Sequence, residues 1–366
     1  MANQAGDGRR SRAAGIREVA AAAGVSPTTV SHALNGMGRI SEATRRHVLE
    51  VAARLDYRAN PSARNMRSGA SGLIAVINQL SAGATWEAAD LEYIMRLNQA
   101  VSRAAWERDS YPTLLPPGVD AGFLARIPLD GAIVADPVHA DLTLRALDEL
   151  GIPTVTVGRD DAADGPGSGA AGTSGGAAGT SGGGTSAGGG RGWWADNDIA
   201  AATTGALEHL AAGGAERVCL VSADTGQSYM TDAVAAYASW CAARGAASRL
   251  HVLPRPVRAD DCYAAVAREC AGPDRADALY LVVEAHVRPA LAAVADAGLT
   301  VPGDVQVAVA SDSVLARTGR PPLTALDLHP ELIGAAVVEL LAARMAGGAA
   351  RTELVRADLV VRASTR

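Results

Sequence analysis

Lysine is absent from this sequence, and all 33 of its basic residues are arginine. Aromatic residues are also scarce, at 4% of the 366 residues, and Phe123 is the only phenylalanine. A base-composition bias in a GC-rich genome explains the missing lysine better than a requirement for guanidinium chemistry does. The arginine-only composition therefore excludes no class of function.

Cysteine is rare, and its spacing is uninformative. The four residues Cys219, Cys241, Cys262 and Cys270 all lie in the second half of the chain, and none forms a C-x-x-C pair. Because the histidines are scattered as well, the sequence argues against a zinc or redox site and predicts buried free thiols.

Long apolar runs are missing too. No run reaches the roughly 18 residues of a membrane helix, and residues 1–12 lack the apolar segment of a secretory signal. The sequence therefore predicts a cytoplasmic, nucleoid-associated protein with no membrane partner.

The common catalytic motifs are also absent. The sequence has no G-x-S-x-G elbow, no phosphate-binding loop and no H-E-x-x-H motif. Ser222 with Asp224, or Asp312 with His329, could form a hydrolytic pair, but no motif supports either one. We therefore expect neither an enzyme nor a protein with a cofactor, a catalytic residue or a metal site.

Two short helices near the N-terminus are the clearest feature that is present. The apolar face of residues 19–23 is followed by Gly24, which can adopt the left-handed conformation of a tight turn. Ser26 then caps a second helix with Pro27 at its first position, where a missing N–H costs nothing, and Val30 in its buried stripe. This pattern predicts a helix-turn-helix, whose second helix enters the major groove of DNA.

The second helix is predicted to expose short polar groups that can reach base edges and phosphates: Pro27, Thr28, Thr29, Ser31 and His32. A third helix starts at Ser41, with Arg45 and Arg46 on its wet side. The alternative is a three-helix structural module without a DNA partner.

A helix of about two turns follows at residues 60–68, with Asn60 as its cap, Pro61 at its first position and Gly69 as its stop. Such a helix is too short to be stable alone in water. We expect it to form only when it pairs with a partner helix on DNA.

These segments resemble the head and hinge of the LacI/GalR family of bacterial repressors across residues 16–72. The matching motifs are V-S-x-x-T-V-S, R-I-S at 39–41, T-R at 44–45, L-x-Y at 55–57 and N-P-x-A at 60–63. The resemblance implies a homodimeric transcriptional regulator, most simply a repressor of a carbohydrate-utilisation operon. Its two heads would bind the half-sites of a palindromic double-stranded DNA operator.

The resemblance also divides the DNA contacts by role. Base edges would be contacted by Pro27, Thr28 and His32, whereas the phosphate backbone would be contacted by Ser26, Thr29, Asn35 and Arg39. In the hinge, whose motif includes Asn60 and Ala63, Met66 occupies the place of an apolar side chain that wedges into the minor groove.

Charge is unevenly distributed along the chain. Residues 1–70 contain eleven arginines and five acidic residues, a balance of +6, which leaves −12 for the remainder of a chain with net charge −6. A basic head on an acidic body suits a protein that touches nucleic acid at one end only.

From residue 72 onward, apolar strand-like runs alternate with helical patterns, which predicts parallel sheets covered on both faces. Strands are expected at 73–77, 131–135, 153–157, 217–221 and 278–283, and helices at 91–106, 142–150, 232–244, 289–298 and 331–345. The predicted fold is an all-α helix-turn-helix head plus an α/β two-lobe core, similar to type I periplasmic binding proteins.

The expected domains are a disordered arm at 1–14, the DNA-binding domain at 15–59, the hinge helix and linker at 60–71, and the core at 72–366. Within the core, the N-lobe is predicted at about 72–160 and 304–326, and the C-lobe at about 193–303 and 327–366. Residues 165–192 include fourteen glycines and a repeated A-A-G-T-S-G-G, so they are predicted to form a flexible loop, either a tether or a slippage-expanded insertion.

Ligands of such folds bind between the lobes, at loops that follow the strands. The candidate effector-binding residues are Gln79, Trp86, Arg159, Asp160, Tyr229, Asp232, Glu284 and Asp312, and His286 lies beside one of them. Acids, arginines and a few aromatic rings suit a sugar-like small molecule.

Two departures from the family pattern stand in the second lobe. Sugar-binding members commonly place an arginine before a Gly-aromatic pair, but here the run from Asp232 to Tyr237 has neither Arg nor Gly. Glu284 stands where Asp is usual. An unusual effector and no effector both remain open, and so does a solute-binding role in transport, although such a protein would have no use for residues 16–69.

Overall fold

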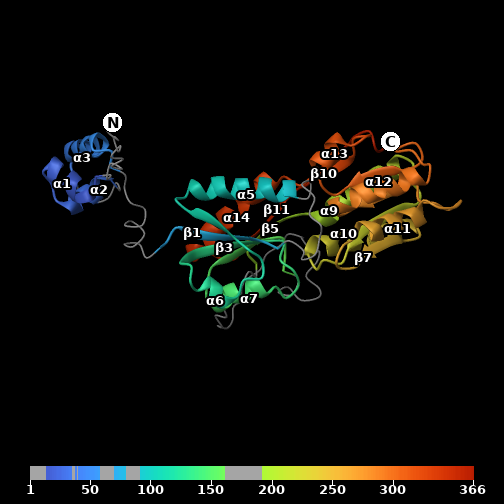
Figure 1. Cartoon of the computed structure of the whole chain (residues 1–366), viewed down its shortest axis with the longest axis horizontal. Coiled ribbons are helices and arrows are strands. Elements are labelled where there is room, and N and C mark those ends of the chain that lie inside the picture. The colour runs from blue at the N-terminus through green and yellow to red at the C-terminus, as the bar shows by residue number, and fades with distance from the viewer. Residues whose placement is uncertain (1–13, 35–37, 39, 58–69, 80–90, 161–191) are drawn as a thin grey trace, which may run out of the picture. The chain divides into compact units, whose positions relative to one another are not determined.

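The computed structural model describes residues 14–34, 38, 40–57, 70–79, 91–160 and 192–366. The chain divides into two compact units, Met1–Ser71 and Gly72–Arg366. The first unit is called the head and the second the core, and their elements are labelled in Figure 1.

In the described part of the head there are three helices, α1 (Ile16–Ala23), α2 (Pro27–Leu34) and α3 (Glu42–Arg54). They enclose one small apolar cluster of Val19, Ala20, Ala23, Val30, Ala33, Val48, Val51 and Ala52. These are the residues whose helical spacing predicted the buried faces of all three helices, so the predicted helix-turn-helix is confirmed.

Local chemistry sets the ends of the head helices. Gly24 ends α1 in the left-handed conformation, with φ of 65°, which a side chain at this position would disfavour. Ser26 and Ser41 cap the next two helices, because their hydroxyls accept the backbone N–H groups of Thr29 at 3.0 Å and Thr44 at 3.1 Å. The predicted serine cap of α2 is therefore confirmed.

The core contains two six-stranded sheets, each forming one lobe. The N-lobe sheet has the strand order β11-β5-β4-β3-β1-β2. Its strands are β1 (Leu73–Asn78), β2 (Tyr111–Leu115), β3 (Leu129–Ala135), β4 (Thr154–Val157), β5 (Trp194–Asn197) and β11 (Thr352–Val355). All pairings that join these six strands are parallel.

Helices cover both faces of the N-lobe sheet. One apolar cluster joins the sheet to α5 (Leu91–Trp106) and α14 (Pro330–Met345). Another joins it to α6 (Ala121–Leu124) and α7 (Leu142–Glu149) on the opposite side (Figure 1). Gly334 lets α14 approach α5 closely, because a Cβ at this position would lie 2.6 Å from the Cβ of Ala100.

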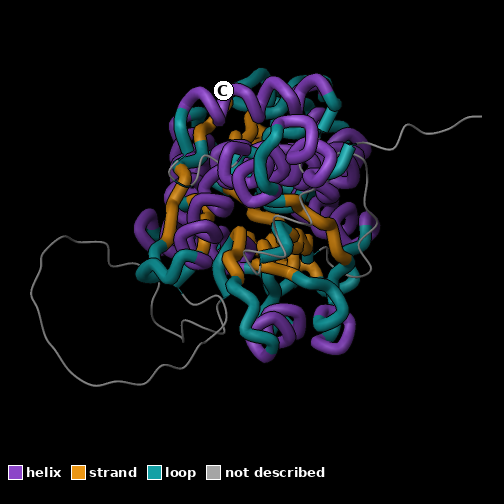
Figure 2. Tube along the Cα trace, turned by 90° about the vertical axis from the view of Figure 1, so that its left-hand side faces the viewer, coloured by secondary structure: helices purple, strands orange, loops and turns teal. Residues whose placement is uncertain are grey.

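The C-lobe sheet has the order β12-β10-β9-β8-β6-β7. Its strands are β6 (Val218–Ala223), β7 (Arg249–Leu253), β8 (Ala278–Leu281), β9 (Gln306–Val309), β10 (Thr324–Asp327) and β12 (Asp358–Val360). Its helices are α9 (Ile199–Ala212), α10 (Ser228–Arg244), α11 (Ala259–Glu269), η1 (Glu284–His286), α12 (Val287–Asp296) and α13 (Val314–Thr318). In Figure 2 the strands of the core lie inside and the helices lie around them.

The predicted division into lobes was wrong in its later part. Residues 304–326, predicted in the N-lobe, contribute β9 and most of β10 to the C-lobe sheet. Conversely, β5, α14 and β11 belong to the N-lobe, although residues 193–303 and 327–366 were predicted in the C-lobe. The α/β units of both lobes have the same hydrophobic pattern, so the pattern predicts the units and not the sheet that each one joins.

The chain crosses between the lobes at three places: after β5, after β10 and after β11. Asn197, which is 3% exposed, joins all three. Its side-chain amide donates hydrogen bonds to the backbone oxygens of Leu328 and Val355, each at 3.0 Å. The three crossings are therefore held together at one point by a single side chain.

Several predictions lie outside the described residues: the arm at 1–13, the hinge helix at 60–68, Trp86, and the low-complexity loop apart from Gly192. Among the helices that are described, none combines the length and the apolar character needed to cross a membrane.

Candidate DNA-binding surface and ligand cavity

The first turn of α2 presents polar groups at the surface of the head. Ser26, Pro27 and Thr28 are exposed, whereas Thr29 is half-buried. The hydroxyls of Ser26 and Thr29 lie 2.9 Å apart and hydrogen-bond to each other. Thr28 is thus the residue of this turn whose side chain is exposed to solvent and takes no part in the cap.

Two predictions about exposed side chains in the head need correction. Ser31 was predicted on the exposed face of α2, but it is only 6% exposed, because this short helix packs against both α1 and α3. Arg45 was predicted on the wet side of α3, but it is half-buried and its Nη1 donates to the backbone oxygen of Ala33 at 3.2 Å. This contact joins α3 to the last turn of α2, where a cation is also favoured by the helix dipole.

His32 is half-buried at the end of α2. A Cβ on Gly38 would lie 2.7 Å from its Nδ1, so the chain after α2 passes close to the imidazole. The other predicted DNA contacts, Asn35, Arg39, Asn60, Ala63 and Met66, lie outside the described residues.

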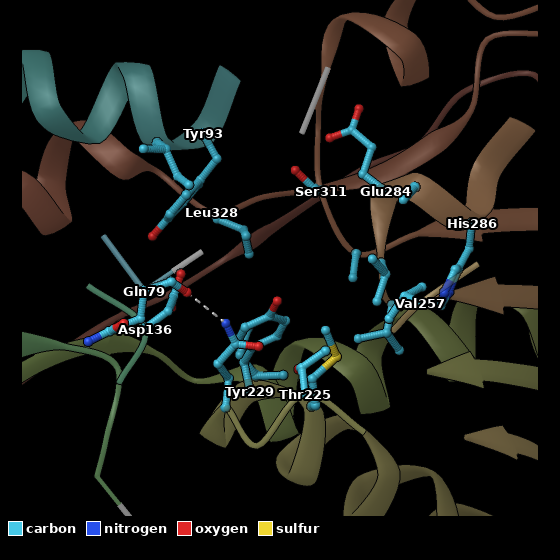
Figure 3. Close-up of a pocket in the computed structure, with 18 of the residues that line it drawn as sticks. Gln79, Tyr93, Asp136, Thr225, Tyr229, Val257, Glu284, His286, Ser311 and Leu328 are labelled. Atoms are coloured by element: carbon cyan, nitrogen blue, oxygen red, sulfur yellow. Dashed lines mark hydrogen bonds between the residues drawn. The ribbon is translucent and has the colours of Figure 1, made fainter. Parts of the chain in front are cut away.

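The core contains a cavity of about 460 Å³ between its two lobes. This volume lies within the range of roughly 300–1,000 Å³ that small-molecule sites have. The cavity lies at the carboxyl ends of strands from both sheets, as expected for an α/β fold. In Figure 3, Gln79, Tyr93 and Asp136 lie on one side, and Glu284, His286 and Val257 lie on the other.

Three of the eight predicted effector-binding residues line this cavity: Gln79, Tyr229 and Glu284. Trp86 lies outside the described residues. Arg159, Asp160, Asp232 and Asp312 do not line the cavity. The rule that ligands bind after strand ends therefore identified the correct edge of each sheet. It did not distinguish the residues that line the cavity from residues next to them.

Arg159 and Asp232 form an ion pair between the lobes. Arg159, which follows β4, donates from Nη2 to both carboxylate oxygens of Asp232 on α10, at 2.7 and 2.6 Å. The same guanidinium lies 3.5 Å from Asp196 and 5.9 Å from the ring centroid of Trp194. Arg159 therefore holds the lobes together and is not available to a ligand.

A second ion pair joins the lobes elsewhere. Glu92 on α5 accepts from Arg317 on α13 at 2.6 Å, and its other oxygen accepts the backbone N–H of Val314 at 2.6 Å. Asp312 is bound by Arg362 at 2.8 Å, which accounts for its position beside the cavity and not in it.

Sequence reasoning missed several polar residues of the cavity. Asp136, Asp196 and Asn197 follow or end the strands β3 and β5, so the rule that ligands bind at carboxyl ends could have identified them. Tyr93 lies inside α5, and Gln227 precedes α10. Nothing in the sequence around Tyr93 or Gln227 marks either residue as part of a binding site.

Burial controls the ionisation of the cavity acids. Desolvation raises the pKa of Asp136 to about 7. It also raises the pKa of Asp196 to about 7, although Arg159 opposes this shift. The pKa of Tyr93 is raised, first by burial and then by the charges of Asp136 and Asp196. Burial lowers the pKa of His286 to about 4, so its imidazole is neutral at neutral pH.

Several buried polar atoms of the cavity have no hydrogen-bond partner in the described structure, among them Asp196 Oδ2, Thr225 Oγ1 and Gln227 Oε1. Buried polar atoms are normally paired, because an unpaired one costs about 1–3 kcal/mol. Their position in a cavity lining fits a site whose ligand supplies the missing partners.

A separate group, Cys219, His251 and Glu269, brings its potential ligand atoms within 4.8 Å of one another. Glu269 is already bound by Arg249 and by His251 Nε2, each at 2.8 Å, and burial raises the pKa of the Cys219 thiol. Because the carboxylate of Glu269 is already paired and the thiol of Cys219 is buried, this group does not support a metal site. All four cysteines are buried and free, as predicted.

Comparisons with known proteins agree with this architecture. Residues 15–60 match the family described as bacterial regulatory proteins, lacI family. Residues 207–365 match the family described as periplasmic binding protein-like domain. The head is thus similar to the lacI family, and much of the core is similar to periplasmic binding protein-like domains.

LacI-family relatives match parts of the chain. Catabolite control protein A of Streptococcus mutans is 47% identical over 62 residues, which cover 17% of this chain and 19% of that protein. The maltose regulon regulatory protein MalI of Escherichia coli is 32% identical over 158 residues, which cover 41% of this chain and 44% of that protein. The matched stretches thus cover less than half of each relative.

Two solved structures resemble nearly the whole chain. The lac repressor dimer bound to operator and the anti-inducer ONPF has a TM-score of 0.73 and 18% identity, covering 97% of this chain and 99% of that one. The transcriptional regulator CelR–cellobiose complex has a TM-score of 0.63 and 21% identity, covering 96% and 99%. At these identities the likeness establishes the fold, which confirms the predicted helix-turn-helix head and two-lobe core.

The structure accounts for one departure from the LacI-family pattern. The run of α10 that corresponds to the arginine and Gly-aromatic segment of sugar-binding members begins with Asp232, whose partner Arg159 comes from the opposite lobe. Position 232 therefore contributes to an ion pair between lobes and not to the lining of the cavity.

Proposed function

We propose that this protein is a sequence-specific DNA-binding transcriptional regulator that represses carbohydrate-utilisation genes in response to a small sugar-like effector. The observation that carries the proposal is the combination of a capped recognition helix, α2, with an enclosed cavity between two lobes on the same chain. Two of the relatives, a maltose regulon regulatory protein and a catabolite control protein, support the same class of function.

Each head would place α2 in a major groove. Thr28, Pro27 and His32 would contact base edges, whereas Ser26, Thr29, Asn35 and Arg39 would position the helix on the phosphate backbone. The hinge residues Asn60, Ala63 and Met66 would lie at the minor groove, with Met66 wedged into a central base step. Ser31 contributes to packing within the head, because its side chain is buried.

A homodimer would present two heads to the half-sites of a palindromic operator. Exposed apolar side chains in the N-lobe support this assembly: Trp106 at the end of α5 is 76% exposed, and Leu114 on the edge strand β2 is 66% exposed. A second copy of the chain would cover both the apolar side chains and the unpaired strand edge.

The effector would act through the relative position of the lobes. A ligand that contacts both sides of the cavity favours one degree of lobe closure over others. In a dimer, closure changes the spacing of the two hinges and therefore the affinity of the paired heads for DNA. Ligand and operator binding would then be coupled reciprocally.

The proposal is tested by gel retardation with a library of inverted-repeat DNA, using the full-length protein with and without candidate carbohydrates. Thr28→Ala should relax base preference at one position per half-site, by about 1–3 kcal/mol. Arg39→Ala should weaken binding to all sequences alike. Equal losses for both variants across the library would contradict the division of roles.

The alternative, a solute-binding role without DNA, predicts a different outcome of the same experiment. Carbohydrate binding without retardation of any inverted repeat would favour it over the regulator.

A further inference from the structure

Asp136 is the least compensated charge in the cavity. It directly follows β3, and its backbone N–H donates to the backbone oxygen of Val157 at 2.8 Å, which holds the residue at the cavity with φ of 54°. Within the described part of the chain, its carboxylate forms no ion pair and accepts no hydrogen bond. Figure 3 places it beside Gln79, on the same side of the cavity as Tyr93.

A second carboxylate adds to this charge. Asp196 uses Oδ1 to accept the backbone N–H of Asn197 at 2.8 Å, while its buried Oδ2 accepts no hydrogen bond in the described structure. Arg159 is 3.5 Å away but is committed to both oxygens of Asp232. One guanidinium thus serves two carboxylates, Asp232 and Asp196, and Asp136 is a third. Two negative charges stay uncompensated when all three are ionised.

Two glutamines near these carboxylates offer hydrogen-bond acceptors to the cavity. Gln79 donates its side-chain amide protons to Asp141 and Thr143, each at 3.1 Å. Gln227 donates to the backbone oxygen of Gln79 at 3.3 Å, as the dashed line in Figure 3 marks. These bonds fix the amide orientations, so both glutamines offer a carbonyl oxygen for further bonding, and that of Gln227 is buried and unpaired.

The two arginines that line the cavity belong to the other lobe. Arg258 precedes α11, and Arg288 lies on α12. Neither is among the causes of the raised pKa of Asp136 or Asp196. On the acidic side of the cavity, Arg159 is therefore shared between Asp196 and Asp232, and Asp136 has no cationic partner in the described part of the chain.

We propose that the effector carries a protonated amine beside its hydroxyl groups, as an amino sugar does, and that the ammonium binds between Asp136 and Asp196. This inference rests on the proposed effector-responsive function. An ammonium has three donors and no acceptor, which matches a side composed of two carboxylates and an amide oxygen. An anionic sugar would meet uncompensated negative charge, and a neutral sugar would leave that charge buried.

Protonation supplies an independent signature. Burial raises the pKa of both Asp136 and Asp196 to about 7, while Tyr93, Arg159 and Asp232 are the other ionisable groups beside them. A bound ammonium lowers the pKa of both carboxyls, since an opposite charge stabilises the ionised form. Binding near pH 7 therefore releases protons, whereas binding of a neutral sugar does not.

The test is isothermal titration calorimetry of the full-length protein at pH 7 in buffers of different ionisation enthalpy. The probes are D-glucosamine and its β-1,4-linked disaccharide, their N-acetylated forms, D-glucose, cellobiose and D-glucuronate. At least one amine-bearing probe should bind at least tenfold more tightly than its N-acetylated and hydroxyl counterparts, with release of protons. Equal or tighter binding of N-acetylated, neutral or anionic probes, or no binding of any amine-bearing probe, would overturn the proposal.

Asp136→Asn locates the amine site. Asparagine has the same shape and tolerates positive φ, so the variant should fold. It should weaken binding of the amine-bearing probe at least tenfold, whereas Glu149→Gln, an exposed charge on α7 of the same lobe, should not change that affinity. Unchanged amine affinity in Asp136→Asn would also overturn the proposal. Gel retardation without ligand tests the proposed function separately, because it does not depend on the cavity.

Discussion

The head and the core build their binding surfaces in opposite ways. In the head, the cap, the exposed threonine and the buried valine of α2 all lie within five consecutive residues, 26–30. In the core, the cavity is lined by residues from Gln79 to Leu328, which come from both lobes. The head is basic and the core acidic, and the most buried charges of the cavity are carboxylates.

The difference teaches what each surface depends on. A short helix with a serine cap needs only its own few residues and a small apolar cluster. The cavity exists only while two lobes hold a defined relation, which the pairs Arg159–Asp232 and Glu92–Arg317 maintain. Damage to one surface should therefore leave the other intact, and this independence can be tested.

The largest effect is expected from Arg159→Asp, which places a fourth carboxylate among Asp136, Asp196 and Asp232. Loss of a half-buried ion pair together with like-charge repulsion should destabilise the core by about 3 kcal/mol. Denaturation followed by tryptophan fluorescence measures this directly, because all five tryptophans lie after residue 72. The double variant with Asp232→Arg should recover at least half of the loss, and simple additivity of the two single variants would contradict an inter-lobe pair.

A smaller loss, confined to the head, is expected from Val30→Ala. Val30 is fully buried in a cluster of only eight residues, so removing two methyl groups should cost about 2 kcal/mol and abolish operator retardation. The tryptophan-detected transition of the core should not move. Val361→Ala, the same truncation at a 58% exposed position of the core, should cost less than about 0.5 kcal/mol. A shifted core transition in Val30→Ala would disprove independence.

The smallest effect, counted per pH unit and per carboxyl, concerns pH. Folding raises the pKa of Asp136 and Asp196 to about 7, so their contribution to stability is fully present below their ordinary pKa and is lost as the pH rises towards 7. The ligand-free core should therefore lose about 1.4 kcal/mol per carboxyl for each pH unit between pH 5 and 7. Asp136→Asn should flatten this dependence in urea denaturation, and Glu149→Gln should not. A core that gains stability over this range would contradict the assignment.

The same contrast explains what could be predicted from the sequence. The three head helices, the caps at Ser26 and Ser41, and α5 at residues 91–106 follow from local spacing, and the structure has them there. The burial of Ser31 could not be predicted, because it depends on the packing of α2 against two helices at once.

In the core, local spacing predicted strands and helices but not their partners. The assignment of β9 and β10 to the wrong lobe and the omission of Asp136 have one cause: the position of a residue relative to the opposite lobe leaves no trace in its neighbours. Arg159 was chosen for its charge, and only the contact with Asp232 from the other lobe removes it from the list of ligand-binding candidates.

Asn197 restricts how the lobes can move. One amide group joins the three segments that pass from lobe to lobe, so these segments cannot slide past one another without breaking two partly buried hydrogen bonds. The low-cost motion that remains is a rotation of the two lobes about this hinge point. Asn197 also lines the cavity. A molecule bound there would therefore contact the hinge point between the lobes as well as the lobes themselves.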